Sequence, residues 1–297
     1  MSQPPKRSHS AAWANALLAL AGCLWGTGFL FGKIALREMT VAENVFFRFL
    51  FACPILVAIL IGKRKPFASR DFLWLVAAAV VGVPVQFLMQ FKGLQLTTVS
   101  HASLIVGTLP VFIACSSTLF LRERLSASEW VALLLSPAGV LAIAFSAGRS
   151  SQPAGPTVLG DLLVLLSMCA AAGSILVTKH LMANYDSLHI TVWMLTIGAV
   201  LLFLGLECFD PVRFHFSPTS WGAAAAQGLL ATAGAYLAWN WGLERVAASR
   251  AGVFLNLEPL VGTMLGVSLL HERLGPTAIL GGALIIGPAV YFSRKPE

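Results

Sequence analysis

The chain alternates between long apolar runs and short polar connections. Ten runs of mainly apolar residues lie at 13–34, 41–62, 70–92, 96–119, 127–146, 158–180, 188–208, 218–241, 247–270 and 275–293. About 20 apolar residues in a helix cross the hydrocarbon layer of a bilayer, roughly 30 Å thick. No connection between the runs is long enough to fold as a separate soluble domain. The pattern predicts an all-α integral membrane protein with ten transmembrane helices.

A short sequence motif occurs once in each half of the chain, at a constant offset of 149 residues. It consists of a Gly-Leu pair, a Ser-x-Ala triplet, a proline and a Glu-Arg-Leu triplet, which begin at Gly93, Ser100, Pro110 and Glu123 and again at Gly242, Ser249, Pro259 and Glu272. Five crossings separate the copies, so the second half is upside down relative to the first. We predict two inverted five-helix repeats, at 1–146 and 158–297, joined by a linker at 147–157 that is rich in Gly, Ser and Pro.

Composition and charge support the membrane interpretation. Hydrophobic residues make up 57% of the chain and charged residues 11%, whereas soluble domains carry about 25% charged residues. The net charge is +7, but it is unevenly spread. With the N-terminus inside, thirteen Lys and Arg residues fall on the cytoplasmic side and five on the other. The positive-inside rule therefore places both termini in the cytoplasm. We expect contact with membrane lipids and no nucleic-acid partner.

The chain contains partial matches to catalytic and metal-binding motifs, and none of these matches is complete. Gly32-Lys33 resembles the end of a phosphate-binding loop but lacks the earlier glycine and the following Ser or Thr, so ATP-driven transport is not encoded here. His271-Glu272 lacks the second histidine of a zinc-protease motif. The five cysteines form no CxxC pair. We predict no catalytic residue, no metal site, no cofactor and no enzymatic activity.

Polar and aromatic side chains inside the apolar runs are the candidates for substrate contact. Gln86 and Gln90 are four residues apart on one helix face, as are Tyr236 and Asn240. Amide groups in hydrocarbon need a partner or water, and aromatic and amide groups together suit a ligand with a flat apolar body and a polar end. We therefore predict a substrate site formed by Trp25, Gln86, Gln90, Tyr236, Trp239 and Asn240.

Prolines within the runs predict broken helices. Pro110 and Pro259 are equivalent in the two halves, so each half is expected to break its fourth helix at the same depth. Glu258 precedes Pro259 directly, and Asn256 lies nearby. Either residue supports the backbone of the kinked helix or takes part in transport as a proton relay, and the sequence leaves both roles open for them.

Three further features have expected structural roles. Arg48 and Glu43 lie five residues apart, and we expect them to pair and serve folding instead of substrate binding. His101 is expected at a solvated helix end. Glycines four apart, as in Gly22-xxx-Gly26 and Gly262-xxx-Gly266, are expected to pack helices within the bundle and not to form a dimer interface.

The repeated sequence motif resembles that of a known protein family. Ser249-x-Ala251, Leu257-Glu258-Pro259-Leu260, Gly266 and Glu272-Arg273-Leu274 resemble the EamA-type repeat of the drug/metabolite transporter superfamily, and the first half resembles it more loosely. The first half has Leu109 where the second has Glu258. The resemblance implies ten helices and a substrate path between the halves. Within the superfamily the chain looks most like bacterial inner-membrane exporters of aromatic amino acids.

These observations predict a secondary transporter or facilitator that exports small organic metabolites, with aromatic amino acids as the expected substrates, by alternating access. A broad exporter of cationic drugs and a non-transporting scaffold or lipid-handling protein are the alternatives. A single glutamate is compatible with proton coupling and with facilitated diffusion. Monomer and homodimer remain equally open.

Overall fold

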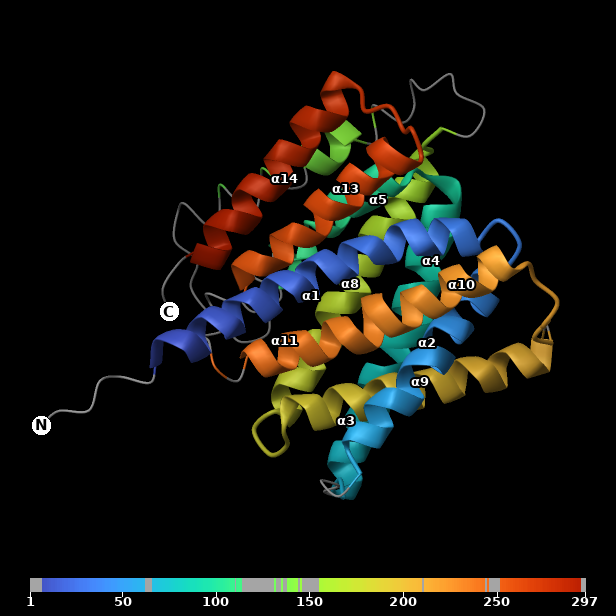
Figure 1. The fold of residues 1–297 in the computed structure, drawn as a ribbon, viewed down its shortest axis with the longest axis vertical. Helices are drawn as coiled ribbons and strands as arrows, with labels where there is room; N and C mark the ends of the chain where they lie inside the picture. Colours follow the sequence, from blue (N-terminus) through green and yellow to red (C-terminus); the bar gives the residue numbers. More distant parts are fainter. Residues whose placement is uncertain are drawn as a thin grey trace, which may run out of the picture.

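The chain folds as a bundle of helices. The structure, a computed structural model, describes residues 7–61, 66–109, 111–113, 131, 135, 138–143, 145, 155–209, 211–243, 245 and 252–294. Every regular element within these ranges is helical, and none of the described residues forms a strand (Figure 1). The all-α prediction is confirmed for this part of the chain.

The helices follow the predicted apolar runs closely. The first half contains α1 (Arg7–Ala35), α2 (Val41–Ile59), α3 (Ser69–Val80), α4 (Gln86–Leu96) and α5 (Val99–Val106). The second half contains α8 (Val158–Leu181), α9 (Ser187–Phe209), α10 (Pro218–Gly228), α11 (Ala235–Leu243), α13 (Leu257–Leu269) and α14 (Pro276–Arg294). The runs predicted at 96–119 and 127–146 extend over residues outside the described ranges. The number ten therefore stays a prediction.

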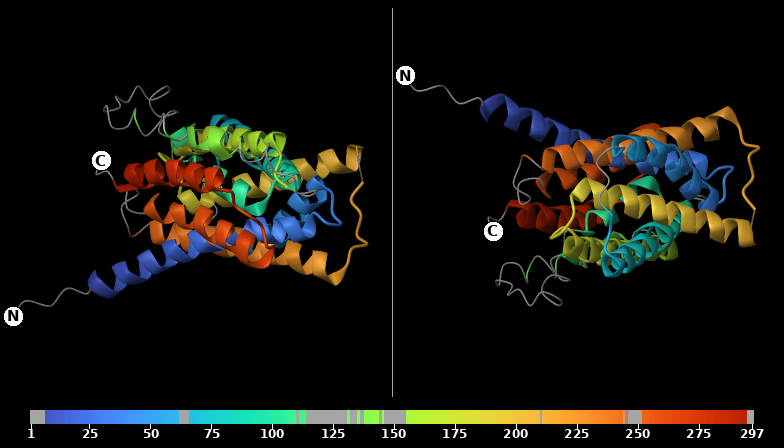
Figure 2. Two further views of the ribbon diagram at one scale, coloured as in Figure 1. Left: turned by 90° about the horizontal axis from the view of Figure 1, so that it is seen from above. Right: turned by 90° about the horizontal axis from the view of Figure 1, so that it is seen from below.

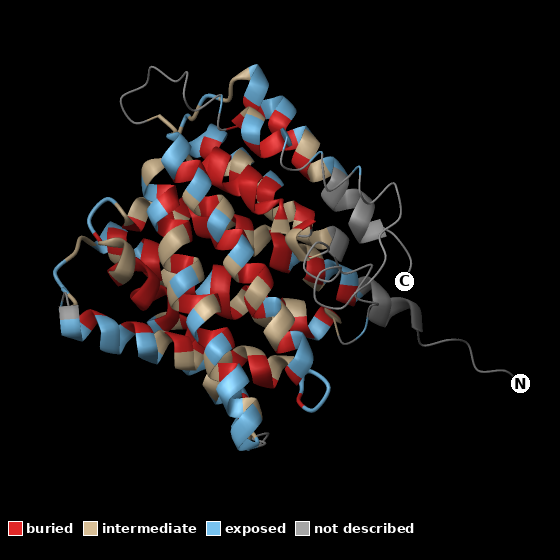
Figure 3. Cartoon of the chain, turned by 180° about the vertical axis from the view of Figure 1, so that it is seen from behind, coloured by how far each residue is buried: buried red, intermediate tan, exposed pale blue. Residues whose placement is uncertain are grey.

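Length and composition identify a multi-pass membrane protein. Among the described residues, five helical stretches are long and apolar enough to cross a bilayer, namely Trp13–Ala35, Val41–Ile59, Ser69–Leu96, Val158–Leu181 and Ser187–Cys208. Many large apolar side chains are exposed on the outside of the bundle, such as Leu204 on α9 and Leu280 on α14. Buried residues gather at its centre (Figure 3). Such an apolar exterior is suited to lipid contact and is rare on soluble monomers.

The third span of each half contains a π-helical segment at the same place. Val81–Val85 joins α3 to α4, and Leu229–Gly234 joins α10 to α11; both segments end at positions 149 residues apart. Pro84 explains the first, because proline removes a backbone donor and disturbs the regular ladder. The second has no proline. Its cause lies in a tertiary contact described below.

The fourth span of each half is interrupted as well. In the first half α5 ends at Val106 and a turn follows at Gly107. In the second half a 3₁₀ segment, Gly252–Asn256, leads into α13. Pro259 lies in the first turn of α13, where its missing N–H needs no partner. The break therefore precedes Pro259 instead of being an internal kink at the proline, and Pro110 lies outside the described residues.

Helix α1 crosses the middle of the bundle and packs closely against α13 and α10–α11 (Figure 1). A Cβ atom on Gly26 would lie 2.7 Å from the carbonyl oxygen of Glu258 and 2.9 Å from Cβ of Val261. A Cβ on Gly262 would collide with the side chain of Ser103 on α5. The prediction that the spaced glycines pack helices within the bundle is confirmed.

The two ends of the bundle are defined by the directions of its helices. The first turn of α1 and the last turn of α14 lie at the same end (Figure 2). We call this the terminal end, and the end at which α1 finishes and α8 begins the far end. The assignment of the terminal end to the cytoplasm remains a prediction from the charge distribution.

The close approach of α1 to α13 is testable by adding one methyl group. We expect Gly26→Ala to lower the thermal unfolding midpoint of the purified protein in detergent, because the overpacked contact costs about 1–3 kcal/mol. Gly222→Ala on α10 is the matched control, since nothing lies within 4 Å of its Cβ position and alanine favours the helix. Equal midpoints for the two variants would contradict this account of the packing.

Candidate functional site

A cavity of about 560 Å³ lies at the centre of the bundle. All six residues predicted to contact substrate line it, namely Trp25, Gln86, Gln90, Tyr236, Trp239 and Asn240. They come from α1, α4 and α11, so residues from both halves form the wall. The volume falls within the roughly 300–1,000 Å³ typical of small-molecule sites.

Among the described residues, the lining of the cavity reaches the terminal end of the bundle. Its wall includes Met182 and Ser187, at the end of α8 and the start of α9, and Leu243, the last residue of α11. Gly242 packs against Ala14 and Leu18 near the start of α1, which places these residues at the terminal end. On α8 the lining begins at Met168, several residues after the start of the helix at the far end.

Three aromatic rings form one side of the cavity. The ring of Trp25 meets that of Tyr236 edge-on, with centroids 5.6 Å apart, and that of Trp239 at a tilt, with centroids 5.3 Å apart. Phe87 and Phe91 of α4 are also part of the wall. Such contacts fix the ring positions and leave aromatic faces for a flat apolar ligand.

The amide groups differ in how far the protein satisfies them. Asn240 accepts a hydrogen bond from Ser187 Oγ at 2.9 Å and donates one to the carbonyl oxygen of Tyr236 at 2.8 Å. Gln90 is buried, and its Oε1 atom has no hydrogen-bond partner among the described residues. Leaving such an acceptor unpaired is costly, which favours a small movement of the Gln90 side chain, a residue of the cavity wall, toward a donor on a ligand or water.

Arg48 belongs to the cavity wall, which the sequence did not predict. The expected pair with Glu43 is wrong. Glu43 closes the N-terminus of α2 with Thr40 and accepts two hydrogen bonds from the guanidinium of Arg213, at 2.8 and 2.7 Å. Positions five apart on a helix point to different faces, and Arg48 points inward.

The guanidinium of Arg48 is held by the second π-helical segment. Its Nε donates to Thr232 Oγ1 at 2.7 Å, and its Nη2 donates to the carbonyl oxygen of Ala231 at 3.3 Å. The group also lies over the ring of Phe87, 4.6 Å from the centroid. This contact accounts for the irregularity in α10–α11, because an interrupted helix presents backbone oxygen to a buried donor.

Glu258 also lines the cavity. No hydrogen bond or ion pair joins its carboxylate to another described residue, although it interacts electrostatically with Arg48 over a longer distance. Of the two roles that the sequence left open, binding of backbone groups at the break has no supporting hydrogen bond from the Glu258 carboxylate among the described residues. Asn256, buried at the break itself, does not line the cavity.

Equivalent positions of the two halves form much of the wall. At an offset of 149 residues these are Phe87 and Tyr236, Gln90 and Trp239, Phe91 and Asn240, Val106 and Leu255, and Leu109 and Glu258. At an offset of 146 residues, which relates the first residues of α2 and α9, they are Trp25 and Ala171, Gly28 and Ser174, Phe29 and Ile175, and Arg48 and Met194. The positions correspond, but the chemistry differs.

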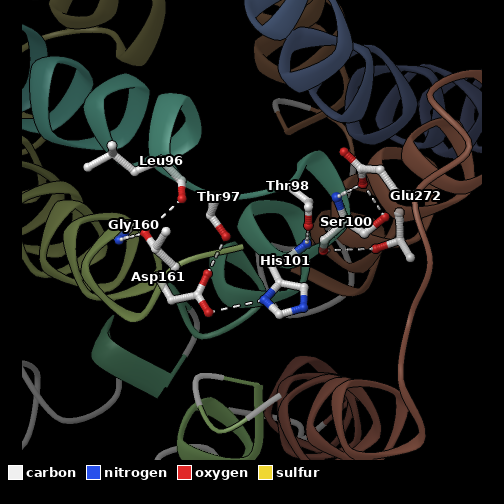
Figure 4. A network of polar contacts seen from close by, with 10 residues as sticks. Leu96, Thr97, Thr98, Ser100, His101, Gly160, Asp161 and Glu272 are labelled. Atoms are coloured by element: carbon white, nitrogen blue, oxygen red, sulfur yellow. Dashed lines mark hydrogen bonds and ion pairs between the residues drawn. The ribbon is translucent and has the colours of Figure 1, made fainter. Parts of the chain in front are cut away.

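A polar network with a buried centre lies at the far end of the bundle, and Figure 4 shows its contacts. Asp161, fully buried near the start of α8, contacts Nδ1 of His101 at 3.0 Å and accepts a hydrogen bond from Thr97 Oγ1. His101 is 2% exposed, so the expectation of a solvated helix end is wrong. Lys33 of α1 donates to the carbonyl oxygens of Leu94 and Thr97.

Glu272, from the repeated Glu-Arg-Leu triplet, extends the same network. Its carboxylate accepts hydrogen bonds from the backbone N–H groups of Val99 and Ser100, at 2.7 and 2.8 Å, and from Ser100 Oγ at 2.6 Å (Figure 4). These groups form the first turn of α5, where an anion is favourable. The triplet of one half thus caps the Ser-x-Ala turn of the other.

A metal centre has no candidate in the part of the chain that the structure describes. No group of three or more His, Cys, Asp or Glu side chains there is placed to hold a metal ion. The wall of the cavity can bind and orient a ligand by stacking, hydrogen bonds and charge. This chemistry is that of a binding site.

Comparison with known proteins gives the family context. The sequence model of the "EamA-like transporter family" matches residues 12–145 and 158–294. An "Uncharacterized transporter" of Archaeoglobus fulgidus is 29% identical over 95% of this chain and 98% of the relative. A "Probable terminal-alkyne amino-acid exporter" of Streptantibioticus cattleyicolor is 25% identical over 95% of this chain and 90% of the relative.

One solved crystal structure has the same fold. It superposes with a TM-score of 0.64 and covers 96% of both chains at 19% sequence identity. Likeness at this identity extends to the fold alone. The names of these relatives do not specify aromatic amino acids as substrates, so that part of the sequence-based prediction stays a prediction.

The far-end network is expected to contribute strongly to stability. We expect Asp161→Ala to lower the unfolding midpoint by an amount that corresponds to about 3 kcal/mol, because it leaves His101 and Thr97 buried without their partner. Asp186→Ala is the control, since that aspartate is exposed and its carboxylate accepts one long hydrogen bond, from Leu188 N at 3.4 Å. A midpoint for Asp161→Ala equal to that of the control would refute this role.

Proposed function

Because the chain belongs to the EamA-like transporter family, we propose that it exports small amino acids with an aromatic side chain through the central cavity. The family match already establishes that the chain is a multi-pass membrane transporter of EamA type for a small-molecule substrate, and not an enzyme. The substrate, the inner-membrane location and the direction of transport are what we add.

One observation carries the proposal. The cavity combines a cluster of three aromatic rings with one guanidinium, one carboxylate and an unpaired amide oxygen. The charges of Arg48 and Glu258 are not joined in an ion pair. An amino acid supplies a carboxylate and an ammonium group, which match a cation and anion held apart. A flat side chain fits the rings of Trp25, Tyr236 and Trp239.

The proposed mechanism is rocking of two inverted halves about this cavity. The equivalent wall positions, the paired π-helical segments and the paired interruptions support an inverted duplication at 1–146 and 158–297. Inverted repeats with broken helices at a central site are typical of alternating access. With the termini in the cytoplasm, the cavity reaches the cytoplasmic end and the network at Asp161 closes the other.

Glu258 has a proposed role in this cycle. Its carboxylate lies on the cavity wall without a hydrogen bond to another described residue. We assign it to the substrate ammonium, with Gln90 Oε1 as a second acceptor. Proton coupling and facilitated diffusion can both use a carboxylate in this position.

Export of cationic drugs is the second candidate, and Glu258 is the observation in its favour. The same cavity contains Arg48, which repels a ligand that carries only positive charge. A scaffold role agrees poorly with relatives that are named transporters. Counter-flow of labelled substrate separates the three possibilities, because a scaffold gives no exchange and a cation exporter exchanges amines in preference to amino acids.

Two matched pairs of variants test the site. We expect Trp239→Ala to lower the initial rate of L-tryptophan counter-flow in proteoliposomes about tenfold at low substrate, because it removes one of the three rings. Trp241→Ala, two residues away and exposed on the same helix, is the control. Equal rates at equal protein content would exclude this wall as the substrate site.

The contribution of the amide side chains to transport is tested by a second pair of variants on α4. We expect Gln90→Ala to reduce L-tryptophan counter-flow several-fold, because it removes the buried unpaired acceptor. Gln95→Ala is the control, since Gln95 is exposed and its Oε1 accepts a hydrogen bond from Lys92. Asn240→Ala is expected to reduce transport as well. Undiminished transport by both Gln90→Ala and Asn240→Ala would contradict the assignment.

A further inference from the structure

Arg48 is a buried cation without an ion-pair partner among the described residues. It is 6% exposed, and the acidic group that interacts with it electrostatically, Glu258, is not within ion-pair distance. A charged group at the centre of a membrane helix costs about 2.5–3.5 kcal/mol on insertion scales and is therefore a functional candidate. Two neutral oxygens, from Thr232 and Ala231, only partly satisfy it.

The guanidinium of Arg48, a residue of the cavity wall, retains donors without a partner among the described residues. A guanidinium has five N–H donors in a planar fork. Only Nε and Nη2 of Arg48 form hydrogen bonds to described residues, so Nη1 keeps its donors for a ligand. The rings of Phe87 and Phe91, which line the cavity, lie 4.6 and 5.7 Å from the guanidinium carbon. The fork is thus held in place at the wall.

We propose that Arg48 binds the carboxylate of the transported molecule and that this contact makes a free carboxylate a requirement for transport. The inference rests on the proposed function, which it deepens by naming the group that is recognised. Arginine suits the role because its fork binds carboxylate with two parallel hydrogen bonds, whereas lysine offers a point charge. The side chain that the sequence assigned to folding therefore selects the substrate.

The broken symmetry of the cavity supports a single orientation of the ligand. The position equivalent to Arg48 is Met194, and the position equivalent to Glu258 is Leu109; all four line the cavity. Each half thus supplies one charge and one apolar counterpart. The carboxylate of a ligand can pair with the cation Arg48 on α2, whereas the corresponding residue on α9, Met194, is uncharged. The ligand is therefore expected to bind in a single orientation.

The proposal predicts a specific selectivity. L-Tryptophan and indole-3-propionate carry a carboxylate, whereas tryptamine and L-tryptophanamide do not. In the wild type, the first two are expected to compete with labelled L-tryptophan, and the last two are expected to compete at least about tenfold less well, since a hydrogen-bonded charge pair corresponds to a factor of about ten to a hundred.

The decisive experiment measures the same competition in Arg48→Gln and Arg48→Lys in proteoliposomes. Arg48→Gln is expected to raise the KM for L-tryptophan about ten- to a hundredfold and to leave the inhibition constant of tryptamine unchanged or lower, and Arg48→Lys is expected to restore part of the loss. Arg37→Gln, which alters an exposed arginine, is the control for net charge. The thermal midpoint of each variant checks folding.

Three results would overturn the proposal. In the first, the wild type accepts L-tryptophanamide as well as L-tryptophan. In the second, Arg48→Gln leaves the KM for L-tryptophan unchanged. In the third, Arg48→Gln weakens the competition by carboxylic acids and by amines to the same extent, which would show that Arg48 has a structural role. In all three cases aromatic amino acids are still transported, so the proposed function stands.

A binding measurement in detergent distinguishes failure of the proposed function from failure of the Arg48 assignment. Suppose that no aromatic amino acid is exchanged but indole-3-propionate raises the unfolding midpoint of the wild type and not that of Arg48→Gln. The proposed function would then be wrong and the assignment of Arg48 right. If neither L-tryptophan nor indole-3-propionate raises the wild-type midpoint at millimolar concentration, the assignment of Arg48 is wrong too.

Discussion

The contact between Arg48 and the π-helical segment of α10–α11 is the interaction on which the site depends. In a bilayer, backbone and charged groups have to be satisfied within the protein, because lipid offers no hydrogen bonds. Thr232 and Ala231 supply oxygens to the guanidinium where the helix is irregular. The charge is thereby stable enough to exist at the core of the bundle, yet it keeps donors for a ligand. A fully paired arginine would give a more stable protein without a binding group.

The second constraint is duplication, which places equivalent positions of both halves around one space. Two identical halves would create a symmetric cavity that suits a symmetric ligand. Here the position equivalent to Arg48 is Met194 and the position equivalent to Glu258 is Leu109, and all four line the cavity. The fold keeps the approximate symmetry that rocking of the halves requires, whereas the side chains have diverged to bind a molecule with two different ends. At the far end, the network around Asp161 and Glu272 joins the halves with buried and partly buried hydrogen bonds.

The sequence predicted the helices and the aromatic and amide part of the wall, because both follow from local periodicity. Apolar runs of membrane length mark the spans, and spacing of four residues places Gln86 with Gln90 and Tyr236 with Asn240 on one face. It failed for Arg48 and His101, whose partners come from distant segments: Thr232 lies 184 residues from Arg48, and Asp161 lies 60 from His101. No local pattern encodes such contacts, and the π-helical segment without a proline was equally hidden. The buried Asp161 at the start of an apolar run was the available signal for the network.

Photo-crosslinking tests most directly whether the cavity is the substrate site. The protein in proteoliposomes is illuminated with 4-azido-L-phenylalanine, and the labelled peptides are identified by mass spectrometry. We predict labels on α1, α4 and α11, around Trp25, Phe87 and Trp239, and loss of these labels when excess L-tryptophan is present. Labels confined to other helices, or labels that L-tryptophan does not displace, would contradict the account.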